Sequence, residues 1–226
     1  MILDCSKYVG PCRCGREHTL ETKKVVVEYN ALDKFDQYMD EVGLSGKRAV
    51  IYDTNTYNLP TLRHVRADQE IVLNAEGLHS EKGMIEDMMR QLDHPDVIVA
   101  VGSGTIMDFG RYPAYHLGIP FVAVPTLASS DGFTANICSI IIDGQKKSIP
   151  MQAVLVVCDL NVVSGAPLWL TVSGISDILA KYISLADWKI AHLVSGEYYC
   201  PMVADLAQEA LTIMRKAADD MAGGGG

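Results

Sequence analysis

The chain has 226 residues, of which 49% are hydrophobic and 21% are charged, a balance that predicts a folded core and excludes an intrinsically disordered protein. Its formal net charge of −9 argues against general affinity for nucleic-acid phosphates or anionic lipid surfaces. No uninterrupted apolar run approaches the roughly 20 residues that cross a bilayer, and the first residues carry no secretory or transit signal. We therefore expect a soluble, cytoplasmic protein that binds neither nucleic acid nor membranes.

Cysteines near the start of the chain raise the question of a metal. A chain with this core needs no disulfides, so we expect all six cysteines to be reduced thiols. Cys12 and Cys14 flank one arginine, with His18 downstream and Cys5 upstream, which has the composition of a soft-metal cluster. Their one-residue spacing can suit a zinc knuckle but is shorter than the usual two to four residues. Structural zinc and no metal both remain open.

Apolar runs rich in β-branched residues alternate with helical patterns through the first two thirds of the chain. This alternation predicts an α/β domain over residues 1–161, a Rossmann-like parallel sheet covered by helices. The expected strands are residues 25–29, 49–52, 69–73, 97–101, 121–124, 139–142 and 154–158, and the expected helices are residues 31–42, 81–92 and 105–117. Asp143-Gly144 predicts a tight hairpin turn that inserts an antiparallel excursion into the sheet.

Residues 162–226 give helical signals only and are expected to form the first helices of an incomplete helical domain. In residues 173–188, apolar side chains recur at three- and four-residue steps, opposite a face that contains Asp177 and Lys181. Residues 202–218 carry an apolar stripe that needs partners to bury it. The four closing glycines predict a flexible tail.

The strongest local motif is a glycine turn, Gly102-Ser103-Gly104-Thr105-Ile106, between an apolar strand and a helix. Glycines let the backbone approach a diphosphate closely, and the free amides and dipole at a helix start favour an anion. The third glycine of the usual dinucleotide fingerprint is absent, because Met107 occupies its place. An ordinary strand-to-helix turn is the alternative.

Two further strand ends carry polar side chains where open sheets bind ligands. Asp53 follows one strand, where its carboxylate can accept bonds from an adenosine ribose or cap a helix. Thr126, Ser129 and Asp131 follow another. Thr126 and Ser129 suit a cofactor, and Asp131 suits a substrate hydroxyl, although a solvated loop is the alternative.

Several motifs taken in order resemble the sn-glycerol-1-phosphate dehydrogenases, within the iron-containing alcohol dehydrogenase and dehydroquinate synthase superfamily. The resemblance runs from about residue 25 to 218, on residues 102–108, 125–132, 174–181, 187–188 and 196–199. It implies NAD(P)H-dependent reduction of a small phosphorylated substrate, dihydroxyacetone phosphate, to sn-glycerol 1-phosphate. A divalent metal, zinc or nickel, polarises the ketone, and the product serves phospholipid biosynthesis.

The resemblance also implies roles for individual residues. Residues 102–106 hold the cofactor diphosphate, Thr126 and Ser129 contact the cofactor, and Asp53 contacts its ribose. Asp131 binds substrate, and Asp177 is the catalytic residue that binds both the metal and the substrate. The family completes its metal site with two histidines from later helices, whereas His192 is the only histidine here after Asp177. We expect His192 to lie on a solvated helix face.

Three hypotheses follow from this departure. The chain is a working oxidoreductase, a C-terminally truncated fragment that binds NAD(P) without catalysis, or a structural or interaction domain that only keeps the fold. Within the superfamily, a polyol dehydrogenase or a dehydroquinate synthase-like enzyme is the alternative activity. The apolar stripe of residues 202–218 favours truncation and predicts self-association into a homo-oligomer.

Overall fold

A computed structural model describes residues 1–223, and its internal contacts divide the chain into two units. The first contains Met1–Lys7, Leu20–Ala128 and Gly132–Ala166, and the second contains Tyr8–Thr19, Ser129–Asp131 and the chain from Pro167 onward. The division drawn from the sequence differs in two ways. It places the boundary five residues earlier, at residues 161 and 162, and it assigns residues 8–19 and 129–131 to the α/β domain.

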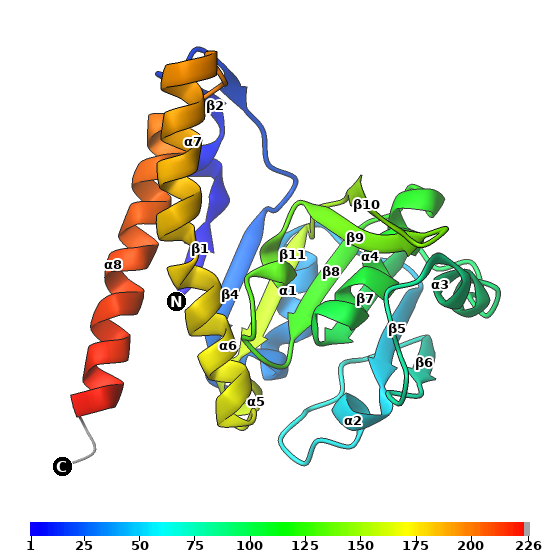
Figure 1. The fold of residues 1–226 in the computed structure, drawn as a ribbon. Coiled ribbons are helices and arrows are strands. Elements are labelled where there is room, and N and C mark those ends of the chain that lie inside the picture. Colours follow the sequence, from blue (N-terminus) through cyan, green and yellow to red (C-terminus); the bar gives the residue numbers. More distant parts are fainter. Residues whose placement is uncertain (224–226) are drawn as a thin grey trace. The chain divides into compact units, whose positions relative to one another are not determined.

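A seven-stranded sheet forms the centre of the first unit, in the order β1-β4-β11-β8-β7-β5-β6 (Figure 1). The strands are β1 (Ile2–Asp4), β4 (Lys24–Glu28), β5 (Arg48–Asp53), β6 (Gln69–Leu73), β7 (Val97–Gly102), β8 (Phe121–Pro125) and β11 (Leu155–Asp159). Neighbouring strands are parallel except β1, which pairs antiparallel with β4. The predicted α/β fold is confirmed, and β1 is an edge strand that the sequence pattern missed.

Helices cover both faces of this sheet. They are η2 (Ala31–Lys34), α1 (Phe35–Glu41), α2 (Thr54–Tyr57), α3 (Lys82–Met89), α4 (Gly104–Leu117) and α5 (Leu160–Val163), with the short turns η1 (Cys5–Tyr8) and η3 (Gly132–Thr134). Strand β7 explains the two-sided cover, because all six of its residues are buried. Val99 packs in the cluster that contains η2 and α1, while Ala100 packs in the cluster that contains α3 and α4.

The predicted hairpin turn is present, with β9 (Ile137–Ile142) paired antiparallel to β10 (Gln145–Pro150). Asp143 and Gly144 form the two-residue loop, with φ angles of 51° and 74°, the left-handed conformation that such a turn demands. The hairpin is a separate two-stranded sheet, however, so the predicted insertion into the main sheet is wrong. Strands β8 and β11 pair directly with each other and leave no place between them.

The second unit joins a short N-terminal ribbon to three helices. The ribbon consists of β2 (Gly10–Pro11) and β3 (Glu17–His18), and the helices are α6 (Leu168–Leu179), α7 (Lys181–Ser195) and α8 (Pro201–Gly223). The single helix expected over residues 173–188 is two helices that meet at Ala180. Of the predicted glycine tail, Gly223 ends α8, and residues 224–226 lie outside the described residues.

Helix α8 leaves the predicted apolar stripe exposed, as expected, and buries other positions. Ala204 and Leu211 are buried, whereas Val203, Leu206 and Ile213 of the predicted stripe are 40%, 37% and 63% exposed. Large apolar side chains on this face therefore lack cover within the described chain.

Residues 168–195 form a helical stretch that could cross a membrane by length and composition, but charged residues such as Asp177 and Lys181 interrupt its apolar sequence. This run has 28 residues and contains an 18-residue stretch with a mean hydropathy of 1.2, of which 6% is buried. It is the one candidate span among the described residues, on length and composition alone. The run is divided at Ala180, and Asp177 and Lys181 flank that division.

Helix α4 lies so close to the sheet that one position admits only glycine. A Cβ on Gly110 would lie 2.6 Å from Cε2 of Phe121 and 2.8 Å from Cβ of Ala100. We expect Gly110→Ala to lower the free energy of unfolding by about 1–3 kcal/mol, since overpacking forces side chains and backbone to shift. Urea denaturation measures the effect, and Gly83→Ala, on α3 with open space around its Cβ, is the control. Equal stability of Gly110→Ala and wild type would contradict the close packing.

Candidate functional site

The order of strands in the first unit creates a topological switch point between β5 and β7. The chain passes from β5 to its neighbour β6 on one side, and from β7 to its neighbour β8 on the other. At such a switch point the connections diverge and leave room outside the carboxyl ends of the strands, where open α/β sheets bind ligands. Asp53 ends β5 and Gly102 ends β7, so two residues singled out from sequence lie at this switch point.

The glycine turn leaves open space at the start of α4. A Cβ on Gly102 would lie 2.8 Å from Cβ of Ile106, whereas a Cβ on Gly104 would meet nothing within 4 Å. Ser103, the N-cap residue, makes no side-chain capping bond to the helix. The space beside Gly104 lies at the start of α4, the positive end of the helix dipole, where unpaired amides favour an anion.

Neighbouring residues fix the position of this turn. The amide of Thr126 donates to the carbonyl of Gly102 over 3.1 Å, and Thr126 is buried. The structure thus places Thr126 directly beside the glycine turn. Met107, where the fingerprint has its third glycine, is fully buried and anchors α4 in the core.

Asp108 holds α4 to the structure behind it. Its carboxylate accepts bonds from the Ser80 hydroxyl at 2.8 Å and from the Ser139 amide at 3.4 Å. Burial raises the pKa of Asp108, while these bonds and the nearby Arg111 oppose the rise. These contacts give Asp108 a structural role, which is to hold α4 against the segments that contain Ser80 and Ser139.

Asp53 acts as a helix cap, the alternative that the sequence left open. Its Oδ1 accepts from the amide of Thr56 at 2.7 Å, and its Oδ2 accepts from the hydroxyl of Thr56 at 3.1 Å. A carboxylate has about four acceptor positions, so each oxygen retains capacity for another bond. Contact with a ribose remains a prediction.

The second unit brings together three residues, Asp131, Asp177 and Lys181. The amide of Asp131 donates to Oδ2 of Asp177 at 3.1 Å, and Nζ of Lys181 lies 2.7 Å from Oδ2 of Asp131. The hydrogen bond to Asp131 raises the pKa of Lys181 and holds it charged. Ser129 belongs to the same unit.

Sequence reasoning missed Lys181 as a partner in this group. Lys181 follows Asp177 by four residues, a spacing that places both on one side of a helical run. This spacing is the signal in the sequence that could have identified Lys181. Asp131 and Lys181 form a charged pair beside Asp177 in the second unit.

The residues present do not complete a catalytic divalent-metal site around Asp177. Among the described residues, the one group that can hold a metal contains neither Asp177 nor His192. His192 is exposed, as expected, with Nδ1 2.6 Å from the carbonyl oxygen of Glu197 and its ring stacked on Tyr199. One carboxylate is too few ligands for a catalytic zinc, which takes three from the protein.

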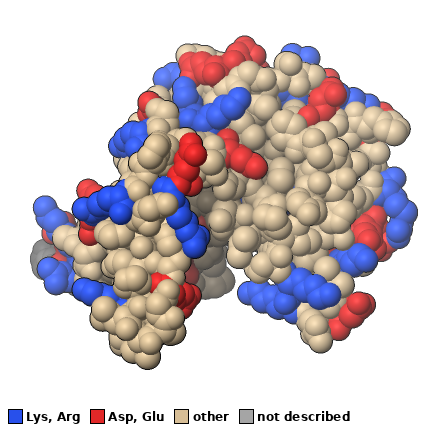
Figure 2. Space-filling model, turned by 90° about the horizontal axis from the view of Figure 1, so that it is seen from above, with Lys and Arg blue, Asp and Glu red and all other residues tan. Residues whose placement is uncertain are grey.

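Figure 2 shows how charge is arranged on one face of the molecule. Basic and acidic side chains occur side by side there, between broad areas without charged residues. Opposite charges so close together weaken any field of a single sign over that face. Recognition of an anion on it depends on locally placed groups.

Comparison with known proteins agrees with this fold and these motifs. The family model for iron-containing alcohol dehydrogenases matches residues 26–167. Glycerol-1-phosphate dehydrogenase [NAD(P)+] from Halalkalibacterium halodurans is 32% identical over 98% of this chain and 59% of its own length. The enzyme of the same name from Bacillus licheniformis is 34% identical over 98% of this chain and 58% of its own length. The chain therefore spans less than two thirds of these relatives.

Solved structures support the fold at lower sequence identity. An iron-containing alcohol dehydrogenase from Corynebacterium glutamicum has a TM-score of 0.65 and 18% identity, over 85% of this chain and 52% of that one. Glycerol dehydrogenase from Schizosaccharomyces pombe has a TM-score of 0.55 and 24% identity, over 70% of this chain and 42% of that one. The match of the family model over most of the chain decides the assignment: this chain belongs to the iron-containing alcohol dehydrogenase family.

Proposed function

We propose that the first unit binds NAD(P)H, with the cofactor diphosphate on the amides of residues 102–106. The observation that carries this proposal is the open space over Gly104 at the switch point, flanked by Thr126 and Asp53. The amides supply hydrogen bonds that need no side-chain charge, which suits an acidic protein. In this proposal Thr126 and Ser129 also contact the cofactor, and Asp53 accepts a bond from its ribose.

The reaction proposed for the whole protein is reduction of dihydroxyacetone phosphate to sn-glycerol 1-phosphate in the cytoplasm, for phospholipid biosynthesis. When bound, NAD(P)H would supply the hydride for the carbonyl carbon, and a proton would complete the new hydroxyl. The support is the sequence similarity to glycerol-1-phosphate dehydrogenases. Asp131 and Asp177 are assigned to the substrate, and Lys181 orients Asp131 through their ion pair.

Without the remaining ligands of a catalytic metal, we expect this chain to bind the cofactor but not to turn over. The test is a fluorescence titration with NADH, run beside an assay of dihydroxyacetone phosphate reduction with and without added zinc or nickel. Saturable NADH binding with no reduction in any arm is the expected result. Absence of binding rejects the cofactor proposal, and metal-dependent reduction shows that this chain completes its active site.

We also propose that the chain self-associates through the exposed apolar face of α8. Val203, Leu206 and Ile213 supply that face. Exposed apolar patches of this kind commonly mark interaction surfaces. Light scattering coupled to size exclusion tests the assembly: Ile213→Glu should shift it toward monomer, and a wild-type chain that is monomeric at high concentration would contradict it.

A further inference from the structure

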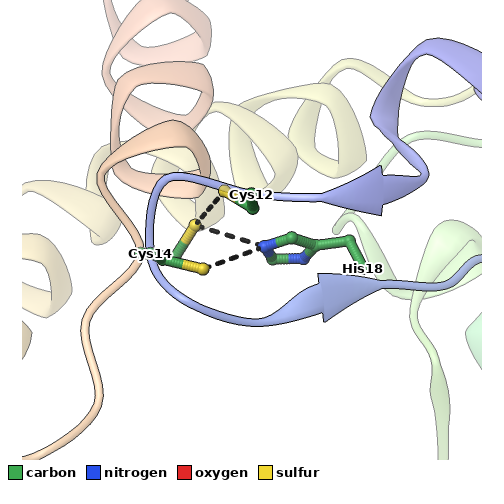
Figure 3. Close-up of side chains that lie close together, drawn as sticks. Cys12, Cys14 and His18 are labelled. Carbon is green, nitrogen blue, oxygen red and sulfur yellow. Dashed lines mark hydrogen bonds between the residues drawn. The ribbon is translucent and has the colours of Figure 1, made fainter.

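Four potential metal ligands converge in the second unit, at a place that the proposed function does not use. They are Cys12, Cys14, His18 and Cys200, and their ligand atoms all lie within 4.8 Å of one another. Figure 3 shows Cys12, Cys14 and His18 turned toward a common centre from the two arms of the N-terminal ribbon. Cys200 comes from the other end of the chain and precedes α8.

Three of the distances between these atoms are close to those of a tetrahedral zinc site. With Zn–S bonds of about 2.3 Å and Zn–N bonds of about 2.0 Å, a regular tetrahedron separates two sulfurs by about 3.8 Å and a sulfur from a nitrogen by about 3.5 Å. The Sγ atoms of Cys12 and Cys200 lie 3.8 Å apart. Nε2 of His18 lies 3.3 Å from Sγ of Cys14 and 3.5 Å from Sγ of Cys200.

The backbone of the ribbon is shaped to present its ligands together. The amide of Cys12 donates to the carbonyl of Arg16 at 2.9 Å, and the amide of Gly15 donates to the carbonyl of Cys12 at 3.0 Å. Gly15 has a φ of 83°, which favours glycine. The register of β2 and β3 pairs His18 with Gly10, so the imidazole returns beside the two cysteines.

Surrounding side chains orient the ligands further. The hydroxyl of Tyr198 lies 3.1 Å from Sγ of Cys14, and the guanidinium carbon of Arg16 lies 3.6 Å from the centre of the Tyr198 ring. Trp188 Nε1 donates to the carbonyl of Tyr198 at 2.6 Å. Such outer contacts are typical of sites in which the metal ligands are held in place.

A disulfide accounts for this cluster less well than a metal does. The Cys12 and Cys200 sulfurs lie 3.8 Å apart, far beyond the roughly 2.05 Å of a disulfide bond, and all six cysteines are free. A disulfide would also leave the third cysteine and the histidine without a role.

We propose that Cys12, Cys14, His18 and Cys200 bind one zinc ion in a closed, structural Cys3His site. Four protein ligands complete the tetrahedron and leave no open position for a substrate. The ion ties the ribbon of residues 10–18 to the start of α8, across 182 residues of chain between His18 and Cys200. This inference does not depend on the proposed dehydrogenase activity.

The first test measures metal in the full chain, purified under reducing conditions and exchanged into chelator-free buffer with zinc. We expect one zinc per chain by elemental analysis. Cobalt(II) in its place should give the strong visible absorption of a tetrahedral ion and thiolate charge-transfer bands. No bound zinc, or cobalt without thiolate bands, overturns the proposal.

Variants then identify the ligands. Cys200→Ser should weaken zinc binding in a chelator competition by at least about tenfold, the scale of losing even an outer-shell partner. Cys5→Ser, which changes a buried thiol outside the cluster, should bind like wild type. His18→Cys retains a fourth soft ligand and should keep binding with altered cobalt bands, which excludes misfolding as the cause. Equal loss in Cys5→Ser and Cys200→Ser overturns the assignment.

Stability provides a readout that does not depend on measuring the metal. Removal of zinc by a strong chelator should lower the melting temperature of the wild-type chain, because binding free energy contributes to the folded state. The Cys200→Ser variant should melt lower from the start and respond little to chelator. A wild-type melting temperature unchanged by complete zinc removal overturns the structural role.

Discussion

Gly104→Val should abolish measurable NADH binding while leaving the chain folded. A Cβ at this position meets no atom within 4 Å, so the branched side chain enters only the space assigned to the cofactor diphosphate. Displacement of that group sacrifices two or three hydrogen bonds to a charged partner, each worth about 1.5 kcal/mol or more. The dissociation constant should therefore rise by about 100-fold or more, as measured by the NADH titration.

Gly83→Val is the matched control for this experiment. Gly83 lies in the first turn of α3, as Gly104 lies in the first turn of α4, and its Cβ also meets nothing within 4 Å. Both variants carry the same helix-propensity cost of valine, so both should unfold at similar denaturant concentrations. Wild-type affinity in Gly104→Val would mean that the glycine turn serves only the fold. Gly102→Val is a poorer test, because its Cβ would clash with Ile106.

The apolar runs in the sequence predicted most strands of the first unit, because a strand buried on both faces leaves a signal within its own few residues. Strands β5, β7, β8 and β11 are buried on both faces and read as continuous apolar runs. Strand β1 escaped detection because it is short, lies at an edge and buries little. The helix expected over residues 31–42 begins instead as a 3-10 turn after Asn30, whose backbone is left-handed.

The two sites differ in how far the sequence could predict them. Asp53 and the glycine turn of residues 102–106 each lie at the carboxyl end of a strand, so the parallel sheet brings them to one edge. The strand pattern of the sequence is therefore enough to predict that they lie close together. The cysteine cluster required Cys200, which lies 188 residues from Cys12. No local period connects such distant residues, and Cys5, the nearer candidate in sequence, is absent from the cluster.

Asp53→Ser should weaken NADH binding about tenfold without a matching loss of stability. Serine caps helices nearly as well as aspartate, so its hydroxyl can accept from the Thr56 amide in place of Oδ1. It cannot offer a charged acceptor to a ribose, and the loss of one such bond is worth about 1.5 kcal/mol, or roughly tenfold in affinity. Asp53→Ala should lose both properties and unfold about 1 kcal/mol more easily.

Asp159→Ser provides the comparison that separates capping from binding. Asp159 also ends a strand and caps a helix, accepting from the amides of Asn161 at 2.9 Å and Leu32 at 3.1 Å. It follows β11, which β8 separates from β7, so its carboxylate lies away from the proposed ribose position. Serine can cap Asn161 but leaves the buried Leu32 amide without its acceptor, so the Asp159 variant should lose stability but keep wild-type affinity for NADH. If Asp53→Ser also binds NADH like wild type, the carboxylate of Asp53 is a helix cap alone.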